Sequence, residues 1–239
     1  MEKITIIKNM LLDAAKYPAT DWLKVVLLGF ILLVSIMGLL TQLNLFTLLF
    51  LILLPLPFGY LFRIIKTSFN GLDILPDFNS WKEMYWDGLK VLVAMFIYAL
   101  PILIIFFITN QSTLTTTDLT NFTLLSLEPI ILGSYLLLLV FIFIGLFELI
   151  GLANMALYDV DILAAFSFRE IIRRISMIGW SNYLIYYLII WIIFVLTALL
   201  SILSIIMLIG IIIIPLLIAP YFLVLMARFL ALVFASSES

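Results

Sequence analysis

Residues 183–234 of the chain read YLIYYLIIWIIFVLTALLSILSIIMLIGIIIIPLLIAPYFLVLMARFLALVF, and Arg228 is the one charged residue among them. As one continuous α-helix these residues would be about 78 Å long, at about 1.5 Å per residue. The hydrocarbon core of a bilayer is about 30 Å thick and needs roughly 20 apolar residues of helix. The stretch is therefore too long for one membrane span, and it predicts two spans joined by a turn near Ser204–Gly210.

The composition of the whole chain also indicates a protein that lies in a membrane. Of 239 residues, 66% are apolar and only 11% are charged. A soluble domain is typically about 45–50% apolar and about 25% charged. A chain of this size has too small an interior to bury so much apolar surface, so a bilayer must cover the rest. The composition excludes a soluble globular domain.

Four more apolar segments precede this stretch. The first two are separated by Thr41–Asn44, and we expect a hairpin turn there because one helix through both would be about 65 Å long. The expected fold is all-α and integral to the membrane, with six transmembrane helices arranged as three hairpins in a domain over residues 23–234. The expected spans are residues 23–40, 45–65, 89–108, 130–153, 183–203 and 211–232.

The basic residues predict the orientation of these spans. All twelve lie in the segments on one side, and the three turns on the other side carry none. Lys and Arg are retained on the cytoplasmic side of membrane proteins. We therefore expect a multi-pass protein of the cell membrane with both termini in the cytoplasm, including a short tail at residues 235–239.

An amphipathic segment at residues 1–22 precedes the first span. Ile4, Ile7 and Leu11 recur at helical spacing on one face, and Pro18 follows. This pattern is typical of a helix that lies at the membrane interface and ends at the proline.

Two cytoplasmic segments carry the spacing of a helix-capping box, Ser80–Glu83 and Ser167–Glu170. Aromatic residues follow the first, and three arginines lie among apolar residues in the second. Both predict short helices at headgroup level, where each arginine gains about 1 kcal/mol from anionic lipid. The alternative is that these charges only set the topology. The residues expected to contact headgroups or a partner protein are Trp81, Tyr85, Arg169, Arg173 and Arg174.

Several short motifs carry a resemblance to a known family. They are Ala15–Pro18 with Asp21, Trp22 and Gly29; Gly59–Arg63; Leu75–Phe78 with Trp81 and Asp87–Lys90; Tyr98 with Pro101; and Ala165–Phe168 with Glu170. On these residues the chain resembles the domain-of-unknown-function 4013 family of prokaryotic, mainly archaeal, membrane proteins. The resemblance implies a polytopic membrane protein and brings no activity, since the family is named for lacking one.

Glu148 is the clearest intramembrane charge in the expected spans. Such a group costs about 2.5–3.5 kcal/mol or more, so it is a candidate for function. It could relay a proton or bind a cation. It could equally pair with Arg63 or Arg228, or lie protonated at the interface.

The residue inventory argues against an enzyme. The chain has no His and no Cys, which removes imidazole and thiolate chemistry. It also lacks a paired intramembrane carboxylate and a glycine-rich phosphate loop after a strand. We expect no catalytic residues, no cofactor and no metal site, and the net charge of −2 gives no reason to expect nucleic acid as a partner.

Two hypotheses for function remain open. The first is a non-enzymatic membrane protein whose cytoplasmic interfacial helices engage lipid headgroups or a partner, either another membrane protein or a second copy. The alternative is a small transporter or channel subunit built on Glu148 and on proline-kinked helices 2 and 6. The prolines in question are Pro55, Pro57, Pro215 and Pro220.

The polar segment at residues 109–123 holds two Asn-x-Ser/Thr sequons, at Asn110 and Asn121. The charge pattern places this segment outside the cell, where glycan attachment requires an exposed loop. We expect glycosylation at Asn110 if the host has the pathway; a chance match in a threonine-rich loop is the alternative.

Overall fold

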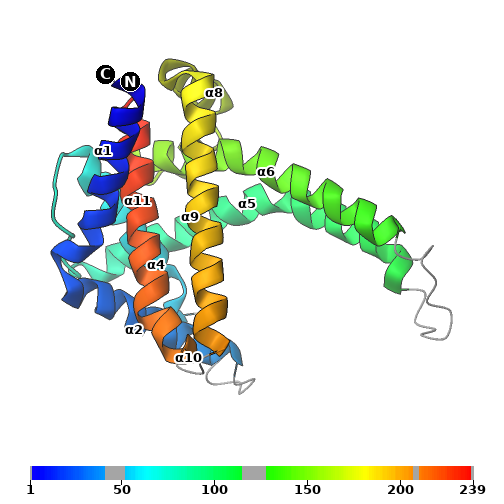
Figure 1. Ribbon diagram of the computed structural model, residues 1–239, viewed down its shortest axis with the longest axis horizontal. Coiled ribbons are helices and arrows are strands. Elements are labelled where there is room, and N and C mark those ends of the chain that lie inside the picture. The colour runs from blue at the N-terminus through cyan, green and yellow to red at the C-terminus, as the bar shows by residue number, and fades with distance from the viewer. Residues whose placement is uncertain (1, 41–51, 115–127, 207–209, 238–239) are drawn as a thin grey trace.

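The computed structural model describes residues 2–40, 52–114, 128–206 and 210–237, and all the regular structure in these ranges is helical (Figure 1). The helices are α1 (Glu2–Lys16), η1 (Tyr17–Thr20), α2 (Trp22–Leu40), α4 (Pro55–Phe69), α5 (Trp81–Leu114), α6 (Glu128–Leu157), α7 (Ile162–Ala165), α8 (Phe168–Ile178), α9 (Trp180–Ile206), α10 (Gly210–Ile213), η4 (Ile214–Ile218) and α11 (Ala219–Ala235).

The helices form one packed body with a long projecting hairpin. α11 contacts α1, α2, α4, α6 and α9, while α5 and α6 pack on each other. Figure 1 shows α5 and α6 running side by side away from α9 and α11. The core lies where the helices converge, and the side chains of Ala14, Ile64, Ile150 and Phe229 are fully buried there.

Four described helical segments are long and apolar enough to cross a membrane: Trp81–Ile108, Gly133–Leu157, Trp180–Ile206 and Ile214–Ala235. The pair Thr5–Thr20 and Trp22–Ser35 qualifies only if its two parts are taken together, and they are bent by 81°. The described residues therefore contain four candidate spans, or five with the bent pair, and the prediction of six is not confirmed. The expected turn between the first two spans falls in residues 41–51, outside the described ranges.

The start of the chain contains the expected amphipathic helix and its break. α1 ends at Lys16, and Pro18 lies within the short 3-10 turn η1. Asp21 then adopts an extended conformation, with φ −152° and ψ 89°, before α2 begins. Because extended backbone cannot continue a helix, the two helices meet at a sharp bend.

The prolines affect the helices in different ways. Pro55 is the first residue of α4, where a proline ring is compatible with the helix. Pro215 lies in η4, a stretch of π-helix that leads into α11. Pro101 is accommodated inside α5, which runs for 34 residues without interruption. The segment after Ser80 is therefore not a separate interfacial helix, because it is continuous with the span that follows.

Candidate functional site

Helix α8 carries the arginines that the sequence pattern singles out. Its inner face is buried and includes Ile171, Ile175 and Ile178 at helical spacing. The helix ends at Gly179, whose φ of +88° lies in the region that favours glycine. This turn directs the chain into α9 and leaves the other faces of α8 exposed.

The N-terminus of α8 differs from the expected capping box. Ser167 occupies the cap position without a capping bond, and its hydroxyl donates instead to the Leu163 carbonyl at 3.1 Å. Glu170 accepts hydrogen bonds from Arg173 at 2.6 Å and from Arg174 at 3.1 Å. The bond from Arg173, with Arg174 beside it, lowers the pKa of the Glu170 carboxyl below its ordinary value.

The three arginines of α8 are in different environments. The Arg174 guanidinium is buried, lies 4.8 Å from the centre of the Phe234 ring and donates to the Ser237 hydroxyl at 3.2 Å. It therefore joins α8 to the end of α11 and does not face outward with its neighbours. Arg169 and Arg173 are exposed.

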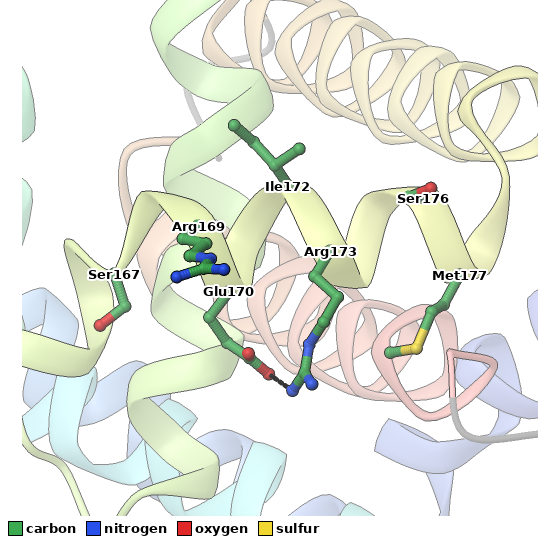
Figure 2. Close-up of a pocket in the computed structure, with 7 residues that line it drawn as sticks. All are labelled: Ser167, Arg169, Glu170, Ile172, Arg173, Ser176 and Met177. Carbon is green, nitrogen blue, oxygen red and sulfur yellow. Dashed lines mark hydrogen bonds and ion pairs between the residues drawn. The ribbon is translucent and has the colours of Figure 1, made fainter.

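Arg169 and Arg173 border a shallow hollow of about 780 Å³ on the outer side of α8. Its other lining residues are Ser167, Glu170, Ile172, Ser176 and Met177. Figure 2 shows Arg169 beside Glu170 and Arg173 joined to it by the ion pair. Arg169 forms no ion pair within the described part of the chain, so its charge remains free to attract an anion.

A second cluster surrounds the loop between α4 and α5. The backbone carbonyls of residues 74–77 accept hydrogen bonds, in order, from Tyr17 (2.9 Å), Lys24 (2.7 Å), Tyr60 (3.0 Å) and Arg63 (2.9 Å). The donors come from three different helices. Since each bond joins the loop backbone to a helix side chain, the four together hold the loop against the helical body.

Aromatic stacking and one ion pair reinforce this loop. The Phe78 ring stacks on Tyr60 at 3.9 Å between ring centres, and Trp81 lies 5.7 Å from Phe78. The Lys24 ammonium lies 2.8 Å from the Asp77 carboxylate. Hydrogen bonding to Lys24 lowers the pKa of the Asp77 carboxyl below its ordinary value. Trp81 thus belongs to the loop cluster, although its side chain stays partly exposed.

Arg228 lies against the same loop. It donates to Asp13 in α1 at 3.0 Å, to Asp73 at 2.5 Å and to the Leu72 carbonyl at 2.9 Å. Its guanidinium also lies 4.7 Å from the centre of the Tyr17 ring. The sequence suggests only Glu148 as a partner for Arg228, because the observed partners Asp13 and Asp73 lie more than 150 residues away along the chain.

Glu148 lies half-buried in α6 and lines a hollow of about 600 Å³ that is otherwise apolar. Its expected partners are engaged elsewhere, since Arg63 binds the loop carbonyls and Arg228 binds Asp13 and Asp73. Within the described ranges the Glu148 carboxylate forms no ion pair. It is therefore a carboxyl group without an ion-pair partner among the described residues, in a helix that is a candidate membrane span.

The remaining predicted residues are not brought to α8. Tyr85 is half-buried in α5, where its ring meets the edge of Trp86. The backbone of Asn110 belongs to the last turns of α5, so part of the expected outer loop is helical. Asn121 lies outside the described residues.

The described chain is all-helical, and its long apolar helices are compatible with an all-α protein of the multi-pass membrane class. Its family can be stated as well. The family described as "Protein of unknown function (DUF4013)" matches residues 42–206, and the chain belongs to this family. The match confirms the resemblance, although the motifs at residues 15–29 precede it. No curated protein and no solved structure matches the chain.

Proposed function

We propose that this protein is a non-enzymatic membrane protein that binds anionic lipid headgroups through the outer surface of α8. The observation that carries the proposal is the exposed guanidinium of Arg169, which has no ion-pair partner among the described residues and lies beside exposed apolar side chains. Phe168, Ile172 and Met177 are all about half exposed on the same short helix. A helix with adjacent cationic and apolar surfaces is suited to the boundary between headgroups and hydrocarbon.

The arrangement of the chain ends supports a cytoplasmic position for this surface. Both ends and α8 lie at the same end of the molecule (Figure 1). Lys3, Lys8 and the arginines of α8 belong to the segments that the positive-inside rule assigns to the cytoplasm. A cell-membrane protein with both termini inside presents α8 to the anionic inner leaflet.

The test is the affinity of the purified protein in mild detergent for phosphatidylglycerol and for phosphatidylcholine. We expect preferential binding of phosphatidylglycerol. The Arg169→Gln variant should bind it about fivefold more weakly, because one cation near anionic lipid is worth about 1 kcal/mol. Lys82→Gln is the matched control, since Lys82 is exposed at the start of α5 and outside the α8 hollow.

Equal affinity of the wild-type protein for the two lipids would contradict the proposal. So would an unchanged affinity for phosphatidylglycerol in Arg169→Gln. A partner protein that is captured with the wild-type protein in mild detergent, but not with Arg169→Gln, would show that α8 binds protein and not lipid.

A small transporter or channel subunit is the second candidate function, favoured by the Glu148 carboxyl group, which has no ion-pair partner in the part of the chain that the structure describes. The π-helical turn at Pro215 adds a local break of the kind often found at functional sites. Ion or proton flux into proteoliposomes that is abolished in Glu148→Gln, with normal folding, would support this candidate. Flux that is absent from the wild-type protein would count against it.

A further inference from the structure

A groove of about 580 Å³ adjoins the α8 hollow where the α5–α6 hairpin leaves the body. α5, α6 and α8 provide most of its walls, and Phe166 closes it next to α8. Its lining residues are Ile97, Tyr98, Pro101, Phe143, Ile144, Phe147, Phe166, Phe168 and Ile172. The groove presents hydrocarbon and aromatic surface, with one hydroxyl group.

That hydroxyl group is already occupied. Tyr98 donates it to the Ala165 carbonyl at 2.5 Å, and Gly151 leaves room for it because any side chain there would clash with it. The Tyr98 ring also lies 4.9 Å from Phe166, and Phe147 meets Phe168 at 6.4 Å between ring centres. These contacts hold the walls in place, so the groove is formed before any ligand enters.

The groove and the cationic hollow are neighbours that meet at Ile172. Ile172 lines both, and Phe168 lies one helical turn before it on the groove side. Arg169 and Arg173 each follow one of these residues and face the hollow. A ligand that fills both must carry an anionic group attached to a hydrocarbon chain.

We propose that a single anionic phospholipid occupies both parts, with its phosphate at Arg169 and Arg173 and one hydrocarbon chain in the groove between α5 and α6. This inference rests on the proposed headgroup binding by α8 and adds a specific site for the chain. A free phosphate would leave the groove empty. A neutral lipid would leave the Arg169 charge without an anion.

The experiment separates the two parts of the site by using two probes. Dipalmitoyl phosphatidylglycerol has chains long enough to enter the groove, whereas dihexanoyl phosphatidylglycerol tests mainly the headgroup. Ile97→Trp places a large side chain at the exposed mouth of the groove and leaves every charge unchanged. Ile185→Trp is the matched control, because Ile185 is similarly exposed on α9 and outside the groove.

We expect Ile97→Trp to weaken binding of the dipalmitoyl lipid about threefold, since a chain already in a micelle gains only packing contacts in the groove. Binding of the dihexanoyl lipid should not change. Arg169→Gln should weaken binding of both lipids, and Ile185→Trp should affect neither. Phe143→Ala removes an exposed part of the groove wall on α6, away from the α8 surface, and should repeat the effect of Ile97→Trp, so the inference does not depend on the folding of a single variant.

Unchanged affinity for the dipalmitoyl lipid in both groove variants would overturn this inference. If Arg169→Gln still weakened both lipids, the headgroup function would stand without the chain site. If Arg169→Gln affected neither lipid, the proposed function itself would fail.

Discussion

Arg228 shows how one side chain joins distant parts of this chain. Its side chain is only 3% exposed, whereas the side chains of its partners Asp13 and Asp73 are 43% and 81% exposed. The guanidinium can reach both carboxylates and a carbonyl because its fork presents several donors at fixed angles. The result is a junction of α1, the loop after α4 and α11.

Replacing Arg228 by Gln should lower the free energy of unfolding by about 2–3 kcal/mol, because several charge-assisted hydrogen bonds are lost at a buried site. Arg228→Lys should lose less, since it keeps the charge but not the fork. Thermal unfolding in detergent measures both, and the exposed Arg169→Gln variant should remain within about 0.5 kcal/mol of wild type. A loss from Arg228→Gln no larger than that of Arg169→Gln would contradict this account.

At the scale of elements, the crossing of α4 and α5 depends on two glycines. A Cβ atom built on Gly59 would collide with the Met84 carbonyl, and one built on Gly88 would collide with the Pro55 carbonyl. Each glycine therefore lets the facing backbone approach closely, as small residues do in membrane helix pairs. The loop cluster lies just beyond this crossing, so the crossing positions Tyr60 and Arg63.

We expect Gly59→Ala and Gly88→Ala each to lower the free energy of unfolding by about 1–3 kcal/mol, because the clashing atoms are backbone and cannot rotate away. Val93→Ile adds one carbon atom to an exposed position of α5 and should have little effect. Thermal unfolding of the three variants gives the comparison. Stability equal to wild type in both glycine variants would show that the helices are not in such close contact.

The contact between α6 and α9 depends on a matched spacing of donors and acceptors. Tyr183 and Tyr187 in α9 lie one turn apart and donate to the carbonyls of Leu146 and Ile142, also one turn apart in α6. These two bonds join the helices where they meet, although α6 and α9 run in different directions (Figure 1). Neither acceptor is recognisable from its residue type, because every residue has a carbonyl group.

At the scale of the whole molecule, the chain ends and α8 lie together while the α5–α6 hairpin extends away from them (Figure 1). The burial of individual residues shows which of them are suitable for a test of membrane topology. Ser237 is a poor site for labelling because it is buried and bonded to Arg174. Ser80 and Ser167 are exposed and suitable.

Because the chain has no cysteine of its own, single cysteines can report topology. Cysteines at Ser80 and Ser167 should react with a membrane-impermeant maleimide only after the membrane is opened. A cysteine at Thr116, in the segment that the charge pattern places outside, should react in intact cells. If the cysteine at Ser80 reacted in intact cells, the result would contradict the proposed orientation.

The presence of apolar spans could be predicted from the sequence because hydropathy depends on residue type and sums along the chain. Four predicted spans correspond to helices that are long and apolar enough, whereas α4 has only 15 residues. The position of Arg174 could also have been read, since it falls at helical spacing between Ile171 and Ile178 on the buried face. Grouping Arg174 with the exposed arginines Arg169 and Arg173 hides this helical spacing.

What the sequence determined by itself is the class of protein: an apolar, all-helical chain with the motifs of one family, whose basic residues predict its orientation. The tertiary structure alone decided which charges are paired, which glycines allow close contact and where a groove meets a cationic hollow. The physical reason is the distance along the chain over which each effect acts. Transfer into a bilayer is a property of each residue and its near neighbours, whereas a hydrogen bond from Arg228 to Asp13 depends on how helices separated by most of the chain pack together.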